Sequence, residues 1–279
     1  MTSVYVPEKK AVADFYDNAI PMFSRLDTNV HVGYWDSPND TSTMQQATIR
    51  MTDIVAEHLA AEPGHRILDV GCGLGAPAIR IAQGVDVEIV GIATSPKLIE
   101  AANKAAREAG VADRVTFEVV DAEELPYAAS TFDSVIAIES LVHMPNRARV
   151  FRNISHILRP GGKLALTDRI EIATPTAHER KVVEGYRKLA FQSPFMKLDD
   201  YVAVMMDANL LPLKFRDITE ETSRHQIHTI QSLNRQAMEL KDVYDAKVIE
   251  ECKLVFEACY KARLPTNMLM VASRGRGPC

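Results

Sequence analysis

The sequence predicts an α/β fold in which a doubly wound, mostly parallel sheet of seven strands carries helices on both faces. Between residues 64 and 170, short apolar segments of strand length alternate with segments in which apolar residues recur at helical spacing. After residue 170 the rhythm changes, and two further strand-like segments are separated by helices. Alternating strands and helices imply right-handed crossovers between parallel neighbours, so we expect the sheet at the centre of the molecule.

Five strands are expected in the alternating region, and the helices carry start and stop signals. Ser95 is a good N-cap, Pro96 suits a first turn, and Gly110 suits the residue after a helix. Upstream, Ser42 and Gln45 have the spacing of a capping box. The strands are expected at 66–70, 87–93, 114–120, 134–140 and 163–170, and helices at about 42–62, 77–83, 95–109 and 147–158.

The remaining chain predicts inserted helices, a strand near 213–219, one long helix over 225–262 and a last strand at 267–273. We therefore expect four parts that pack as one unit. They are an N-terminal helical cap (1–62), a core (63–170), an inserted helical lid (171–212), and a segment of final strands and helix that completes the sheet (213–279).

Composition argues against several classes of partner. The formal net charge is −5 and no block of Lys or Arg is dense, so nucleic acid is not expected. The first residues lack an apolar leader, and no apolar run approaches the roughly 18 residues of a membrane span, so we expect a cytoplasmic protein without a membrane partner. The four cysteines lack metal-site spacing, so we expect reduced thiols and no metal.

The strongest chemical signal is "LDVGCGLGAPA", residues 68–78, where a strand ends in an acid and three glycines follow. Gly71, Gly73 and Gly75 permit positive φ and let a ligand approach the main chain. The turn lies where ligands bind to parallel sheets, at the carboxyl ends of the strands. A dinucleotide would want an acid at the end of the second strand, but Thr94 follows that strand instead. Asp69 beside the turn favours a cationic ligand over a pyrophosphate.

Four ordered segments carry a family resemblance. "LDVGCGLGAPA", "VVDAEELPY" (119–127), "TFDSVIAIESLVHMP" (131–145) and "RPGGKLALTD" (159–168) resemble the class I S-adenosylmethionine-dependent methyltransferases. They are most similar to the small-molecule branch of sterol, ubiquinone-type and rebeccamycin sugar-type natural-product enzymes. The resemblance covers residues 15–170 by motif and the remainder by layout. It implies a Rossmann-like fold, an S-adenosylmethionine cofactor, and a role in natural-product biosynthesis.

The resemblance also implies contacts along that cofactor. The turn of Gly71, Gly73 and Gly75 would follow its amino-acid portion, with Asp69 steering the ammonium group. Thr94 and Ser95 would supply hydroxyl or backbone contacts in place of the missing second-strand acid. The remaining contacts would come from Asp121, Ala122 and Glu123 at the adenine, and from the Ile138 carbonyl and Glu139 at the methionine end.

Aromatic residues in the first part of the chain are candidates for covering the cofactor. The segment "NVHVGYWDS", residues 29–37, resembles the cover used by this branch, and Tyr34 and Trp35 offer flat faces that exclude water from a sulfonium. Tyr16, on the preceding helix, would close over the same site. The alternative is that these aromatic side chains only pin the helical cap to the sheet.

His143 and Asp168 are the candidate catalytic residues. His143 follows the fourth strand and would serve as the general base, while Asp168 ends the fifth strand and would orient the imidazole or bind the acceptor hydroxyl. Sugar O-methylating relatives have a second histidine where this chain has Val142, which brings it closer to the sterol-type pattern. Oxygen is therefore only slightly favoured over a prenyl, alkene or aromatic carbon, whose methylation could be followed by cyclisation.

The predicted lid is rich in apolar residues, which favours a bulky hydrophobic acceptor, although some of them are expected to pack inward. These residues are Phe191, Phe195, Met196, Val204, Met205 and Met206. His225 and His228 lie near the same region without further support. An NAD-dependent oxidoreductase and a non-catalytic binding protein remain as other classes, and the sequence leaves a homo-oligomer open.

Overall fold

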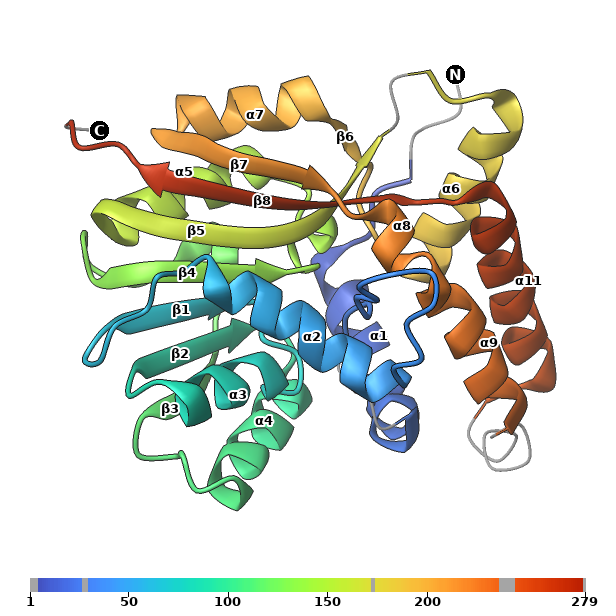
Figure 1. Cartoon of the computed structure of the whole chain (residues 1–279), viewed down its shortest axis with the longest axis horizontal. Helices are drawn as coiled ribbons and strands as arrows, with labels where there is room; N and C mark the ends of the chain where they lie inside the picture. Colours follow the sequence, from blue (N-terminus) through green and yellow to red (C-terminus); the bar gives the residue numbers. More distant parts are fainter. Residues whose placement is uncertain (1–4, 27–29, 172–173, 236–243, 278–279) are drawn as a thin grey trace.

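The computed structural model describes residues 5–26, 30–171, 174–235 and 244–277. Within these ranges a central sheet of eight strands follows the order β3-β2-β1-β4-β5-β8-β7, with the short strand β6 paired on β5 (Figure 1). Strands β1 to β6 pair in parallel, and β8 runs antiparallel between β5 and β7. The strands are β1 (Arg66–Val70), β2 (Glu88–Ala93), β3 (Val115–Val119), β4 (Phe132–Ile138), β5 (Leu158–Glu171), β6 (Met196–Lys197), β7 (Leu210–Asp217) and β8 (Thr266–Arg274).

Helices cover both faces of the sheet, as the sequence predicts. One apolar layer joins α2, α3 and α4 to the sheet through side chains such as Met51 and Ile99, and the other joins α5 and α7 through Phe151 and Tyr201. The helices are α1 (Lys9–Leu26), α2 (Met44–Glu57), α3 (Ala76–Gly84), α4 (Pro96–Glu108), α5 (Arg147–Ile157), α6 (Ala177–Leu189), α7 (Leu198–Asp207), α8 (Thr219–Thr222), α9 (Arg224–Arg235) and α11 (Ala246–Ala262), with 3-10 turns η1 (Ala122–Glu124) and η2 (Leu141–His143). In the described ranges no helix has the length and apolar character that crossing a membrane would need.

Local signals place most helix ends, with two corrections. Ser95 caps α4 as expected. The capping box of α2, however, is formed by Thr43 and Gln46, one residue later than the predicted pair, because the Ser42 N–H is already bonded to Asp40. The single long helix expected over 225–262 is also wrong. A separate helix, α11, starts after the N-cap Asp245.

The segment predicted as a lid divides between two environments. Helix α6 lies with α9 and α11 beyond the carboxyl ends of the parallel strands (Figure 1). Helix α7 instead packs on the sheet, where Tyr201 and Met205 are fully buried. Only the first part of the insertion is therefore in a position to face a site at the strand ends.

Candidate active site

A cavity of about 290 Å³ opens at the carboxyl ends of β1, β2 and β4. The strand ends and the loops after them form one wall, and α1 forms the opposite wall. Most of the predicted site residues lie together in its lining, although they come from segments that are far apart in the sequence. They are Tyr16, Asp69, Gly71, Gly73, Thr94, Ser95, Asp121, Ala122, Glu123, Ile138, Glu139 and His143.

The glycine turn serves packing as much as access to the backbone. Gly71, Gly73 and Gly75 all have positive φ. A Cβ on Gly71 would lie 2.2 Å from the Ser140 Cβ, and one on Gly75 would lie 2.6 Å from the Phe117 ring. Gly75 does not line the cavity, which corrects its predicted place along the ligand. Glycine is required there because the turn must fit between β3 and α4.

Asp69 is the clearest binding group in the cavity. Its side chain is 2% exposed, and its Oδ2 is buried without a hydrogen-bond partner. Burial raises the pKa of Asp69 to about 7. A buried carboxylate without a cation is costly, so this position is prepared for a positively charged ligand group.

Asp121 and Glu123, in the loop after β3, line the cavity and are already engaged. The Asp121 Oδ1 accepts the Glu123 N–H at 2.8 Å and thereby caps η1. The ammonium of Lys9, on α1, bridges Asp121 Oδ2 at 2.7 Å and Glu123 Oε2 at 3.1 Å. Helix α1 therefore supplies the cation for the two acids that the sequence assigns to the adenine.

Thr94 and Ser95 line the cavity at the end of β2 but differ in exposure and in hydrogen bonding. Thr94 is exposed. The Ser95 hydroxyl accepts the Leu98 N–H as the cap of α4 and donates to Asp17 of α1. A ligand hydroxyl at this point could therefore bond to Thr94, whereas the Ser95 hydroxyl is already bonded to Asp17 and to the Leu98 N–H.

Glu139, directly after β4, occupies a left-handed conformation with φ +52° and is 9% exposed. Its Oε1 accepts the Val32 N–H at 2.9 Å, and its Oε2 pairs with the Arg169 guanidinium at 2.6 Å. Burial raises the pKa of Glu139, but Arg169, His31 and the Val32 N–H outweigh it and hold the pKa below its usual value. The left-handed backbone at Glu139 is strained, and the contacts of its side chain with Val32 and Arg169 hold it in place. These contacts fix a carboxylate at the cavity wall.

His143 is held as a neutral imidazole with a defined tautomer. Its Nδ1 lies 2.9 Å from the Phe191 carbonyl oxygen, which can only accept, so Nδ1 carries the hydrogen. Its Nε2 lies 2.8 Å from the Tyr16 hydroxyl. Burial lowers the pKa of His143 to about 4, although the bond to Phe191 acts in the opposite direction. Nε2 is therefore a hydrogen-bond acceptor, and the Tyr16 hydroxyl donates to it.

Asp168 does not reach His143, and its predicted role is wrong. It lies inside β5 rather than at its end, in register with Met268, and its side chain therefore points to the face covered by α5 and α7. There it accepts the Tyr201 hydroxyl at 2.8 Å and lies 3.8 Å from Arg147. The group that orients the imidazole is instead the Phe191 carbonyl.

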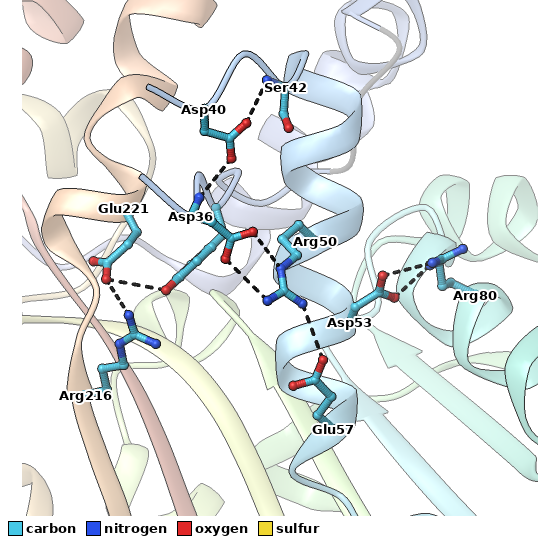
Figure 2. Close-up of polar contacts among 10 residues, drawn as sticks. Asp36, Asp40, Ser42, Arg50, Asp53, Glu57, Arg80, Arg216 and Glu221 are labelled. Atoms are coloured by element: carbon cyan, nitrogen blue, oxygen red, sulfur yellow. Dashed lines mark hydrogen bonds and ion pairs between the residues drawn. The ribbon is translucent and has the colours of Figure 1, made fainter. Parts of the chain in front are cut away.

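Tyr34 and Trp35 are absent from the cavity lining, which corrects their predicted role as its cover. Tyr34 is 3% exposed and donates to Glu221, which also pairs with Arg216. Trp35 is 1% exposed and stacks on His228 at 5.0 Å. Figure 2 shows the polar contacts that tie this segment down, including Asp36 with Arg50 of α2 and Glu221 with Arg216. Their position matches the alternative reading, in which they pin the cap to the fold.

The six apolar residues predicted for the acceptor lid do not line this cavity either. Phe195 packs among α6 and α11, Met205 is in the sheet core, and Met206 is 55% exposed. Phe191 contributes its carbonyl, while its ring stacks on Phe15 of α1 at 4.9 Å. Of the two unassigned histidines, His225 accepts the Gly33 N–H and His228 stacks on Trp35, so both support the 31–35 segment.

Tyr16 is the one residue of the α1 wall that was predicted from the sequence. Lys9, Val12 and Ala13 line the cavity together with Tyr16, from one face of α1. Their spacing of three, four and seven residues is the repeat of a helix face and would have grouped them. His31 also lines the cavity, with Nε2 3.3 Å from Thr52; it lies in the segment 29–37 that the resemblance assigns to the cofactor cover, but only Tyr34 and Trp35 were predicted from that segment. In the described residues no group of His, Cys, Asp or Glu could hold a metal ion.

A parallel sheet with a ligand cavity at its strand ends and an unpaired acid beside a glycine turn defines a class of cofactor-binding α/β enzymes. Comparisons identify the family. Residues 61–195 match a family described as a methyltransferase domain. The 27-O-demethylrifamycin SV methyltransferase of Amycolatopsis mediterranei is 40% identical over 223 residues, 77% of this chain and 79% of that protein. The methyltransferase GfsG of Streptomyces halstedii is 38% identical over 76% and 77% of the two chains.

Among solved structures, that of the [4+2]-cyclase SpnF superposes with a TM-score of 0.85 at 27% identity, over 99% of this chain and 100% of that one. The chain belongs to the S-adenosylmethionine-dependent methyltransferases, in the branch whose curated members act on natural products. Its cofactor is S-adenosylmethionine. This membership settles the choice of class against an NAD-dependent oxidoreductase.

The cavity fits that cofactor on the chain's own observations. Asp69 presents a buried, unpartnered carboxylate oxygen where a cationic group belongs. The turn at Gly71 and Gly73 leaves the backbone uncovered at the same point. The loop after β3 carries the acceptor oxygens of Asp121 and Glu123, and the Tyr16–His143 pair joins α1 to η2. Cationic, anionic and hydrogen-bonding parts of one ligand thus have separate partners.

Proposed function

We propose that the protein transfers a methyl group to a hydroxyl oxygen of a small hydrophobic natural product, with His143 as general base. The observation that carries this is the neutral imidazole of His143, whose Nδ1–H is fixed by the Phe191 carbonyl and whose Nε2 accepts a hydroxyl hydrogen at the cavity wall. A group that accepts from one hydroxyl in the resting protein can accept from an acceptor hydroxyl in the same place.

The cofactor contacts follow from the strand-end wall. Asp69 takes the α-ammonium, the turn at Gly71 and Gly73 lies along the amino-acid portion, and Glu139 with the Ile138 carbonyl borders the methionine end. Thr94 and Ser95 face the ribose. Asp121, Ala122 and Glu123 border the adenine, where a carboxylate accepts from the exocyclic amine. When bound, the cofactor supplies an electrophilic methyl group on a positively charged sulfur.

The chain's residues then have three tasks. They hold the acceptor oxygen in line with the methyl carbon, which alone can supply roughly 7–11 kcal/mol. They exclude water, through α1 and its Tyr16. His143 Nε2 takes the hydroxyl proton as the oxygen attacks, a contribution of about 10²–10⁴-fold. Because the pKa of Tyr16 is raised, first by burial, its hydroxyl stays protonated and must leave Nε2 before the acceptor can bind there.

The test is a methyl-transfer assay with isotope-labelled methyl donor and a panel of hydroxyl-bearing hydrophobic natural products. Mass spectrometry would report the gain of one methyl group, and NMR of the product would locate it on oxygen or carbon. His143→Ala should reduce turnover by about 10²–10⁴-fold while calorimetry finds unchanged cofactor binding. Equal loss of turnover and binding, or loss of neither, would refute the role as base.

Carbon methylation with subsequent cyclisation is the second candidate, because the likeness to the [4+2]-cyclase SpnF extends over nearly the whole chain. In that case Glu139 and His143 would stabilise a cationic intermediate or remove a proton from carbon. A product methylated on carbon, whether or not it is also cyclised, would favour this candidate. Three further points stay predictions from the sequence: the protein acts in the cytoplasm, it has no nucleic-acid partner, and it can form a homo-oligomer.

A further inference from the structure

The Phe191 carbonyl that orients His143 belongs to a turn that would not hold this shape unaided. Phe191 follows α6 with φ +50°, a left-handed conformation that a bulky side chain adopts at a cost. The Gln192 N–H closes on the Arg187 carbonyl at 2.8 Å, and the Ser193 N–H donates to the Val142 carbonyl at 2.7 Å. The turn is thus attached to the residue immediately before His143.

Two buried arginines hold the other carbonyls of this turn. The Arg187 Nε donates to the Ser193 carbonyl at 3.0 Å, and the Arg147 Nη1 donates to the Pro194 carbonyl at 3.0 Å. Arg187 is 7% exposed and Arg147 is 4% exposed. They come from α6 and α5, so side chains of two helices clamp the carbonyls of this turn.

Asp168 supports this clamp from within the sheet. Its Oδ2 lies 3.8 Å from the Arg147 Nε and accepts the Tyr201 hydroxyl at 2.8 Å. A buried guanidinium needs such a counter-charge. The acid that the sequence assigns to the imidazole therefore acts on an arginine that holds the turn beside it.

We infer that Arg147 and Arg187 are positioning residues, which fix the Phe191 carbonyl against His143 Nδ1 so that the Nε2 lone pair faces the cavity. This inference rests on the proposed role of His143 for its catalytic meaning. In a histidine, the hydrogen bond made by one ring nitrogen sets the protonation of the other. Without a fixed carbonyl the neutral ring can exchange to the Nε2–H tautomer, which has no lone pair for a hydroxyl proton.

The test reads the tautomer of His143 by long-range ¹H–¹⁵N NMR of the cofactor-loaded full chain, with His143→Gln identifying the signals. The wild type should show the Nδ1–H form. Arg187→Met removes the donor to the Ser193 carbonyl, and we expect a mixture containing Nε2–H and a fall in kcat of about 10–100-fold at similar acceptor KM. Arg180→Met, an exposed arginine on the same helix, is the matched control and should leave both measurements unchanged.

A second variant keeps the inference testable if Arg187→Met does not fold. Arg147→Lys keeps a positive charge beside Asp168 and one donor for the Pro194 carbonyl, so it should retain the Nδ1–H form, whereas Arg147→Met combined with Asp168→Asn should not. An unchanged tautomer in Arg187→Met and in the double variant would overturn the inference. The outcome stays distinct from the proposed function, because the tautomer is read without acceptor, whereas full activity of His143→Ala would refute only the base.

Discussion

The two walls of the cavity treat a ligand in different ways. On the strand-end wall, Asp69 holds a carboxylate oxygen without a partner, and the glycine turn is rigidly packed between strands and helices. On the α1 wall, Lys9 occupies Asp121 and Glu123, and the Tyr16 hydroxyl occupies His143 Nε2. On the strand-end wall Asp69 has an oxygen without a hydrogen-bond partner, whereas α1 already binds Asp121, Glu123 and His143, which ligand groups would contact.

This difference predicts opposite effects of substitutions on the two walls. A substitution on the strand-end wall should weaken the fold or the binding of cofactor. Removing a competing group from α1 should strengthen binding of cofactor or acceptor. Four substitutions test that contrast, beginning with the one of largest effect.

Gly71→Ala should cause the largest loss, in the stability of the fold itself. The new Cβ would lie 2.2 Å from the Ser140 Cβ at a residue with φ +76°. Overpacking and left-handed strain together should cost about 3 kcal/mol of unfolding free energy. Gly64→Ala is the matched control, since φ is +84° there but no atom lies within 4 Å, and it should cost about 1 kcal/mol. Urea denaturation measures both, and equal losses would mean that the turn has room to relax.

Asp69→Asn should weaken cofactor binding by about 10–100-fold, since a hydrogen bond to a charged group contributes about 1.5–3 kcal/mol. Because the pKa of Asp69 is about 7, wild-type affinity should be constant above that pH and fall up to tenfold per pH unit below it. Calorimetry between pH 5.5 and 8 tests this. The variant should lack that pH dependence, and a slope retained in the variant would assign it to another group.

The same substitution should stabilise the ligand-free protein. A raised pKa means that the folded state binds this proton more tightly than the unfolded state, so the contribution of Asp69 to stability is present below pH 4 and is lost as the pH rises through 7. The melting temperature of Asp69→Asn should therefore exceed that of the wild type by a margin that grows from pH 4 to 7.

Tyr16→Phe keeps the ring contacts with Phe15 and His143 but removes the hydroxyl that donates to Nε2. Loss of a competing hydrogen bond of about 0.5–1.5 kcal/mol should lower the acceptor KM by about two- to tenfold. Turnover at saturation should be unchanged. A fall in kcat instead would mean that Tyr16 relays the acceptor proton to His143 rather than competing with the acceptor.

Lys9→Met should have the smallest effect, because the lysine side chain is half-exposed and such pairs contribute about 0.2–1 kcal/mol. Releasing Asp121 for the adenine amine should strengthen cofactor binding by about two- to fivefold and reduce its salt dependence. Lys10→Met, which removes an exposed pair with Asp14, is the control. Weaker binding in Lys9→Met would show that α1 retains the cofactor rather than competing with it.

Particular residues show how far the sequence could predict the site. The strand-end residues follow one another locally, so the order of an apolar strand, an acid and glycines identified Asp69 and the turn. The prediction for Asp168 failed because side chains alternate between the two faces of a strand, and Asp168 shares its face with Leu166 and Ile170, which α5 and α7 cover. Its neighbour Arg169 points to the other face and reaches Glu139.

The sequence alone determined the α/β alternation, the glycine turn and the cluster of acids at the strand ends, because each depends on residues close together in the chain. Only the tertiary structure decided which groups meet His143. Tyr16 is 127 residues away in sequence and Phe191 is 48, and both reach it because α1 and the turn after α6 pack beyond the strand ends. Contacts between distant segments depend on packing, and no local pattern of residue types records which backbone carbonyl will face an imidazole.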